Sequence, residues 1–154
     1  MLVMLDTIDK RILRALQRDS SQTNAELAEQ AGLSATPCSR RIQLLKQRGV
    51  IAGYTALVNP AKVGLGFMAF VRITLDRQDK TTVEHFAREM EAAPEVLECY
   101  LMAGGYDYLL RVYARDLDDY QRFQMETLTR IEGVRNVVTE IPLKGIKQTN
   151  RLPI

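Results

Sequence analysis

The sequence contains few of the residues that build metal sites and disulfide frameworks. It has two cysteines, Cys38 and Cys99, and one histidine, His85, in 154 residues. The cysteines lie far apart and form no Cys-X-X-Cys pair, whereas a structural zinc site needs four Cys or His ligands. We therefore expect neither a metal site nor a cofactor, and we interpret both cysteines as small buried apolar side chains.

The sequence also lacks long hydrophobic runs and low-complexity segments. It contains no run of about 18 apolar residues, the length that a transmembrane helix needs. The first residues, MLVMLDTIDKR, do not combine a basic segment with a long apolar one, as a signal peptide does. We expect a cytoplasmic protein with no membrane partner.

Charge is distributed unevenly along the chain, although the net charge is only +2. Residues 1–58 hold eight basic and five acidic residues, and the remainder holds 13 basic and 14 acidic residues. The excess of positive charge lies in the first third of the chain, and positive charge favours binding to phosphates.

The stretch LSATPCSRRIQLLKQRGVIAG, residues 33–53, has four basic residues and no acidic one. The spacing of apolar residues predicts a helix over residues 6–18, capped by Asp6 or Thr7, and a second helix that Thr23 or Asn24 caps. Gly32 can adopt the positive φ of a tight turn, and Ser34 can cap a third helix with Pro37 in its first turn. Two helices joined by a tight turn, the second of them basic, are typical of a helix-turn-helix that enters the DNA major groove.

The third helix has two distinct sides at about 100° per residue. Cys38, Ile42 and Leu45 share one side, which we expect to pack on the other helices. The opposite side, called here the polar face, consists of Thr36, Ser39, Arg40, Gln43 and Gln47. Side chains of these types bind base edges, and the flanking Arg41, Lys46 and Arg48 suit phosphates.

Residues 50–58 are short, apolar and partly β-branched, which predicts a small strand or hairpin, the wing of a winged helix-turn-helix. Asn59-Pro60 is a turn signal and marks a domain boundary. We therefore predict a DNA-binding domain over residues 1–58, a linker over 59–66 and a second domain over 67–154.

The second domain alternates strand and helix patterns in the order βαββαβ. Strands are predicted over residues 67–75, 96–102, 108–114 and 134–143, and helices over 81–93 and 117–131. This order predicts an α+β protein whose second domain is ferredoxin-like, with both helices on one face of an antiparallel sheet. The other face would be uncovered, and a second copy of the chain is the simplest partner for it.

Four stretches resemble the Lrp/AsnC (leucine-responsive, feast/famine) transcriptional regulators over nearly the full length. They are LDTIDKRILRALQRD, LSATPCSRRIQLLKQRGVIAGYTALVNP, GGYDYLLRV and IKQTNRLPI. The resemblance implies dimers that assemble into tetramers or octamers, binding to double-stranded DNA at a palindromic operator, and a free amino acid that binds between dimers and shifts DNA affinity. It also implies control of genes for amino-acid metabolism or transport.

The resemblance also indicates which residues bind DNA and effector. For DNA it implies Ser34, Thr36, Pro37, Ser39, Arg40, Arg41, Gln43 and Lys46, to which the sides of the third helix add Gln47 and Arg48. For the effector it implies Gly104, Tyr106 and Asp107, with Gln148, Thr149 and Asn150 of the tail, and Gly105 is included as the second glycine of the pair. A glycine pair between strands exposes backbone groups to an amino acid, and Asp107 can either bind its ammonium group or hold the loop. Many family members carry an acidic residue where this chain has Gly105.

Two other functions compete with an amino-acid-responsive regulator. An architectural protein that bends DNA without a ligand is the closer alternative, but the polar face favours sequence preference and no minor-groove wedge is evident. An enzyme is the other, but the sequence shows no nucleophile with a base, no metal cluster and no phosphate loop. We expect no catalytic residues and no enzymatic activity.

Overall fold

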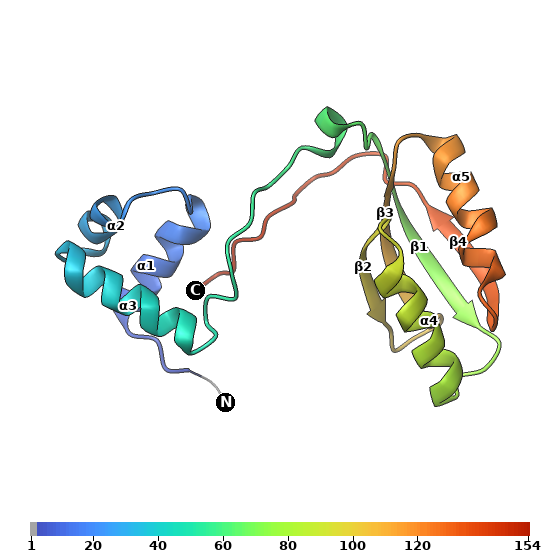
Figure 1. The fold of residues 1–154 in the computed structure, drawn as a ribbon, viewed down its shortest axis with the longest axis horizontal. Helices are drawn as coiled ribbons and strands as arrows, with labels where there is room; N and C mark the ends of the chain where they lie inside the picture. The colour runs from blue at the N-terminus through green and yellow to red at the C-terminus, as the bar shows by residue number, and fades with distance from the viewer. Residues whose placement is uncertain (1–2) are drawn as a thin grey trace. The chain divides into compact units, whose positions relative to one another are not determined.

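The computed structural model describes residues 3–154, which form two compact units (Figure 1). The first unit contains the residues up to 56 together with Ile146–Ile154, and the second contains Leu57–Gly145. This division differs from the expected domains at the C-terminus, because contacts with the first helix hold the tail in the first unit. Among the described residues, no helix has both the length and the hydropathy to cross a bilayer.

Three helices form the first unit: α1 (Thr7–Arg18), α2 (Asn24–Ala31) and α3 (Ala35–Gln47). Asp6 caps α1 and Thr23 caps α2, each through a capping box with an acidic residue three positions later. A capping box satisfies two backbone N–H groups that a helix start leaves unpaired. The three helices bury one common core that includes Ile12, Ala28 and Cys38.

The predicted strand or hairpin over residues 50–58 was wrong, because none of these residues lies in a strand. Val50 and Ile51 pack against the helical core. Leu57 and Val58 have exposed fractions of 80% and 62%. A strand needs a neighbour to pair its backbone groups, and a β-branched pattern alone cannot supply one.

The second unit has the predicted βαββαβ order. Its elements are β1 (Phe67–Leu75), α4 (Lys80–Ala92), β2 (Val96–Leu101), β3 (Tyr108–Ala114), α5 (Leu117–Glu126) and β4 (Val134–Glu140), with short 3-10 turns at Pro60–Val63 and Leu128–Arg130. All strand pairs are antiparallel, in the order β2-β3-β1-β4. This is the ferredoxin-like arrangement that the sequence predicted.

The second helix of this unit is shorter than its apolar spacing predicted. We expected a helix to residue 131, but α5 ends at Glu126 and a 3-10 turn follows. Leu128 and Ile131 are buried all the same. Leu128 reaches the core from the tighter turn and Ile131 from the residue directly after it, so the apolar spacing did not reveal the change in backbone. Strand β4 likewise ends at Glu140 instead of residue 143.

One face of the sheet carries the core and the other is open. Ala69, Val71 and Ile73 of β1 are fully buried with side chains of α4 and α5, and the residues between them in β1 are only half-buried. The register places the following residues together on the opposite side, called here the open face: Phe70, Arg72, Glu98, Tyr100, Leu109, Arg111, Val138 and Glu140. Ion pairs join Arg72 to Glu140 and Arg111 to Glu98.

Candidate nucleic-acid interface and effector site

The turn between α2 and α3 sets the angle at which α3 is presented. Gly32 has φ 73°, a left-handed conformation that costs other residues free energy. Its N–H donates to the Glu29 carbonyl at 3.1 Å, and the Leu33 N–H donates to the Ala28 carbonyl at 2.8 Å. Ser34 then occupies the cap position of α3, but its hydroxyl makes no capping hydrogen bond.

The predicted packing side of α3 is confirmed. Cys38 is completely buried, and Ile42 and Leu45 have exposed fractions of 7% and 2%. Burial raises the pKa of the Cys38 thiol, and burial together with Glu91 raises the pKa of Cys99 to about 11. Both thiols therefore stay protonated near neutral pH and are poor nucleophiles.

The polar face of α3 is accessible. Thr36, Arg40 and Gln43 are exposed and Ser39 is half-buried. Together with Asn24 and Ala35, these side chains line a shallow hollow of about 380 Å³. Within residues 3–154, none of these four polar side chains makes a side-chain hydrogen bond or ion pair, so all four are available to a ligand such as a base edge.

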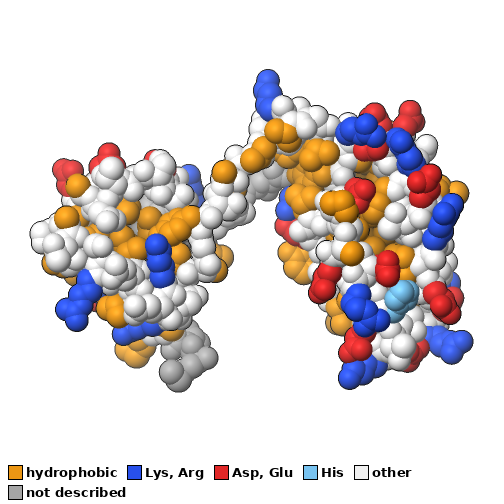
Figure 2. Space-filling model, viewed as in Figure 1, with side chains coloured by type: hydrophobic (Ala, Val, Ile, Leu, Met, Phe, Trp, Pro, Cys, Tyr) orange, Lys and Arg blue, Asp and Glu red, His pale blue; other side chains and the backbone are white. Residues whose placement is uncertain are grey.

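The helix α3 carries basic side chains and no acidic one. Figure 2 shows Lys and Arg side chains over α3. Arg48 is exposed at the end of α3, and the Lys46 ammonium lies 4.8 Å from the centroid of the Tyr54 ring. This distribution fits a surface that meets phosphates with one edge of α3.

Arg41 is engaged within the protein, although the sequence suggested a phosphate contact. Its guanidinium donates to Asp6 at 2.6 Å and to Asp9 at 2.8 Å. The Asp9 backbone N–H and then the Arg41 guanidinium hold the pKa of Asp6 below its usual value. Arg41 thus ties the start of α1 to α3, and its charge is already balanced by two carboxylates.

We expect Arg48→Gln and Arg41→Gln to differ in the salt dependence of DNA binding. A lost phosphate contact reduces the slope of log affinity against log salt concentration by about 0.9. Arg48→Gln should show this reduction, whereas Arg41→Gln should keep the wild-type slope and lower the melting temperature. Titrations of one DNA duplex at four salt concentrations measure both slopes, and a reduced slope for Arg41→Gln would assign Arg41 to a phosphate.

The predicted effector turn connects β2 to β3. Gly104 and Gly105 are exposed, and Gly104 has φ 154°, within the range that favours glycine. A Cβ atom added at either glycine would have no neighbour within 4 Å outside the adjacent residues. The Arg72 guanidinium of the open face lies 5.5 Å from the centroid of the Tyr106 ring. The turn therefore presents bare backbone next to one edge of the open face.

Asp107 holds the loop, one of the two roles that the sequence left open. Its carboxylate accepts the Leu75 backbone N–H and the Gln78 side-chain amide, each at 2.6 Å. Its own N–H donates to the Ile73 carbonyl at 2.8 Å. Asp107 is 5% exposed, and both of its carboxylate oxygens are engaged by protein donors.

The tail residues Gln148, Thr149 and Asn150 are exposed and belong to the first unit, whereas the Gly104–Asp107 turn belongs to the second. The structure therefore does not gather these two sets of predicted effector residues within one unit. Beyond them, Leu152 donates its N–H to Gln17 at 2.5 Å, and the Gln17 amide donates to the Leu152 carbonyl at 3.3 Å. Arg14 donates to the Ile154 carbonyl at 2.5 Å.

Removal of residues 152–154 should destabilise the first unit. The truncation loses three hydrogen bonds to α1 and the packing of Ile154 on the helical core. Each bond contributes about 0.5–1.5 kcal/mol. We expect a lower melting temperature for the truncated chain and a smaller decrease for Gln17→Ala, measured by circular dichroism. Gln121→Ala, on the exposed side of α5, is the control, and equal melting of all four proteins would show that the tail contributes nothing.

Three side chains that hold distant segments of the chain together were not predicted from the sequence. Gln78, Arg14 and Gln17 carry no local signal, because each binds a partner distant in sequence. The Asp6-X-X-Asp9 spacing does signal a capping box, but nothing in it points to Arg41. Within residues 3–154, no group of three or more His, Cys, Asp or Glu side chains is placed to hold a metal ion.

Comparison with known proteins matches both units. Residues 5–52 match the winged helix-turn-helix DNA-binding family, and residues 68–152 match the Lrp/AsnC ligand binding domain. The leucine-responsive regulatory proteins of Escherichia coli (strain K12) and Klebsiella pneumoniae are each 41% identical to this chain over 150 residues, covering 97% of this chain and 92% of theirs.

Solved structures agree with these matches. A transcriptional regulator from Neisseria meningitidis, in complex with L-Met, superposes with a TM-score of 0.94 at 39% identity, over 97% of each chain. AsnC of E. coli superposes with a TM-score of 0.88 at 27% identity, over 97% of this chain and 99% of its own.

The two matched units define a transcription regulator in which a helix-turn-helix DNA-binding domain is joined to an amino-acid-binding domain. The chain belongs to the Lrp/AsnC family. The members of this family are transcriptional regulators and not enzymes.

Proposed function

We propose that this protein binds specific operators through the polar face of α3 and controls genes of amino-acid metabolism or transport in the cytoplasm, in response to a free amino acid and without a cofactor. The observation that carries the proposal is the set of four exposed or half-buried polar side chains on α3 that have no partner in the described chain, residues 3–154. Side chains left free on a basic helix are suited to hydrogen bonding with base edges.

In this proposal, different residues of α3 contact the bases and the phosphates of the operator. Thr36, Ser39, Arg40 and Gln43 face the bases, with Gln47 at the end of the same face. Lys46 and Arg48 bind phosphates, and Ser34 and Pro37 lie at the start of the helix, where the backbone approaches DNA. Arg41 positions α3 through its ion pairs with Asp6 and Asp9.

Self-association completes the operator contact. Two copies that cover each other's open faces form a dimer, which can further assemble into a tetramer or octamer. The buried Nε atoms of Arg72 and Arg111, on that face, have no hydrogen-bond partner within residues 3–154. Acceptors of a second copy would satisfy them. A dimer presents two α3 helices and so matches a palindromic operator.

The effector surface in this proposal is the bare backbone of Gly104 and Gly105 with Tyr106, placed between dimers. Asp107 fixes this turn from inside, and Gln148, Thr149 and Asn150 would contribute from another chain of the assembly. The complex of the Neisseria meningitidis regulator with L-Met supports an amino acid as the ligand.

A thermal-shift panel of the twenty amino acids tests responsiveness. A ligand that binds only the folded state stabilises it by about 2.7 kcal/mol at a hundredfold excess over its dissociation constant. We expect at least one amino acid, L-Met among the first to be tried, to raise the melting temperature. A panel with no active member would leave a DNA-bending protein without a ligand as the better description.

A further inference from the structure

An exposed apolar side chain, Leu44, lies on α3 beside the polar face, and the proposed operator contacts do not use it. Leu44 has an exposed fraction of 37%, whereas Ile42 and Leu45 of the same helix are buried. Within residues 3–154, the core of the first unit includes Ile42 and Leu45 but not Leu44. Pro37 is also exposed and lies about two helical turns before Leu44 on the same side of α3.

The surroundings of Leu44 distinguish it from a leucine that is merely exposed. It lines a hollow of about 550 Å³ along α3. Met4, Pro37 and Leu44 give this hollow an apolar lining, and Arg40 and Arg48 give it positive charge. We call it the apolar hollow. Apolar and basic side chains are therefore neighbours along one side of a single helix.

The net charge that the apolar hollow offers a ligand is positive. Its two carboxylates, Asp6 and Asp9, are paired with Arg41 at 2.6 and 2.8 Å. Within residues 3–154, Arg40 and Arg48 form no ion pair. A ligand that fits must have apolar surface next to negative charge. The major groove of DNA meets this requirement, because the methyl group of thymine lies there between the two phosphate backbones.

The apolar hollow also adjoins the polar face. Thr36 and Arg40 line both this hollow and the hollow of about 380 Å³ that Ser39 and Gln43 line. Thr36 and Arg40 thus lie between a polar hollow and an apolar one, which contains Leu44. The polar hollow offers hydrogen bonds to base edges, whereas Leu44 offers only van der Waals contact. The C5-methyl group of thymine is the apolar group that base pairs present in the major groove.

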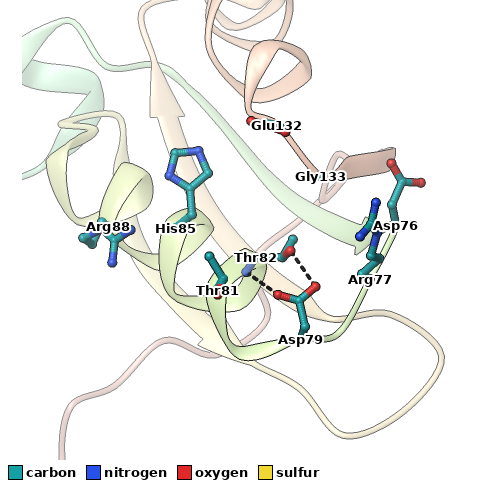
Figure 3. A pocket seen from close by; sticks show the side chains of 9 residues that line it. All are labelled: Asp76, Arg77, Asp79, Thr81, Thr82, His85, Arg88, Glu132 and Gly133. Atoms are coloured by element: carbon teal, nitrogen blue, oxygen red, sulfur yellow. Dashed lines mark hydrogen bonds between the residues drawn. The ribbon is translucent and has the colours of Figure 1, made fainter.

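The hollow of about 800 Å³ beside α4, in the other unit, lacks such an arrangement (Figure 3). Figure 3 shows Arg77 and Arg88 on opposite sides of it and Asp76 turned outward. Asp79 is occupied in capping α4, since it accepts the Thr82 N–H at 3.0 Å and the Thr82 hydroxyl at 2.9 Å. Its charged side chains do not converge on one ligand, in contrast to the lining of the apolar hollow.

We propose that Leu44 is a specificity-determining residue that contacts the 5-methyl group of a thymine in the operator. The proposal rests on the proposed function, because it requires α3 to lie in the major groove. Leu44 lies one helical turn beyond Arg40, a rise of about 6 Å, and successive base pairs are about 3.4 Å apart. The thymine therefore lies within about two base pairs of the base that Arg40 contacts.

Replacement of thymidine by deoxyuridine tests this contact, because it removes the methyl group and leaves every hydrogen-bonding group of the base. Operators are first selected with the full chain from a random duplex library, and each thymine is then replaced singly. We expect one replacement, within about two base pairs of the position whose preference Arg40→Ala relaxes, to lower affinity about fourfold per half-site, as for one buried methyl group. Fluorescence anisotropy at one fixed salt concentration measures the affinities.

Three variants assign the methyl contact to Leu44. Leu44→Ala should bind the thymine and uracil operators with equal affinity, and it should melt like the wild type because Leu44 lies outside the core. Leu44→Met keeps an apolar side chain of similar volume and should retain the sensitivity to uracil. Leu117→Ala, which removes a leucine of α5 that is 47% exposed, is the matched control and should respond as the wild type does.

The proposal is overturned if uracil weakens binding at no position, or if Leu44→Ala retains the wild-type sensitivity at every position. Retained sensitivity together with a smaller assembly in sedimentation would assign Leu44 to a contact between copies of the chain. If the wild type prefers the selected operator but does not respond to uracil, the proposed function stands and the Leu44 contact falls. Equal affinity for selected and random DNA, measured before any uracil is introduced, would show that operator binding itself has failed.

Discussion

Arg40→Ala is expected to lower operator affinity by about 5- to 150-fold, or ~1–3 kcal/mol, and to relax the sequence preference at one base position in each half-site. Arg40 is exposed on the polar face of α3, between Thr36 and Gln43, and it has no partner within residues 3–154. A bidentate contact of a guanidinium with guanine is the commonest specific contact in the major groove, and alanine removes it entirely.

The discriminating quantity is the ratio of affinities for an operator and for random DNA. Arg40→Ala should reduce this ratio, whereas Arg48→Ala should weaken both affinities and leave the ratio unchanged. Arg130→Ala, in the other unit, is the control for a general loss of positive charge. Fluorescence-anisotropy titrations at one fixed salt concentration measure all of them. An unchanged ratio for Arg40→Ala would remove Arg40 from the base contacts.

Asp107→Ala is expected to destabilise the second unit whether or not an amino acid is present. The substitution leaves the Leu75 N–H and the Gln78 amide without their acceptor. A buried donor left unpaired costs about 1–3 kcal/mol. Since ~1 kcal/mol corresponds to about 4–8 °C in a domain of this size, the melting temperature should fall by several degrees. Hydrogen exchange at the Leu75 amide should also become faster.

Two further variants help to interpret the stability of Asp107→Ala. Asp107→Asn keeps one carbonyl oxygen for the Leu75 N–H and should lie between the wild type and Asp107→Ala in stability. Asp76→Ala removes a nearby exposed carboxylate that makes no side-chain hydrogen bond within residues 3–154, and it should melt like the wild type. If Asp107→Ala melts normally but loses amino-acid binding, then Asp107 is a ligand-binding residue and not a structural one.

The sequence predicted the elements whose signals are local. Asp6 and Thr23 mark helix starts by their own side chains, and Gly32 marks the turn because other residues avoid its positive φ. The buried side of α3 follows from the spacing of Cys38, Ile42 and Leu45. The period-2 alternation of β1 and β3 predicted their bounds, because each buries one side against helices.

Features that depend on distant partners could not be predicted. The ion pairs of Arg41 join residues more than 30 positions apart, and its sequence environment resembles that of Lys46 and Arg48, which are proposed to bind phosphates. The tail returns to α1 through Gln17, a contact that spans 135 positions. The predicted strand or hairpin over residues 50–58 failed for the complementary reason, because these residues have strand-like composition but pair with no strand within residues 3–154.

The sequence predicted the position of Asp107 but left its role open. The GGYDY stretch placed it in the effector turn, and only the structure shows its carboxylate turned inward, toward Leu75 and Gln78. The accessible groups of the proposed effector turn are therefore the two exposed glycines and the half-buried Tyr106.

The central claim is that an amino acid controls sequence-specific DNA binding by this protein. Operators selected from a random duplex library can be titrated with the protein, with and without each of the twenty amino acids at millimolar concentration. We predict a palindromic consensus and at least one amino acid that changes operator affinity severalfold. Equal affinity for selected and random DNA, or an operator affinity that no amino acid changes, would contradict the account.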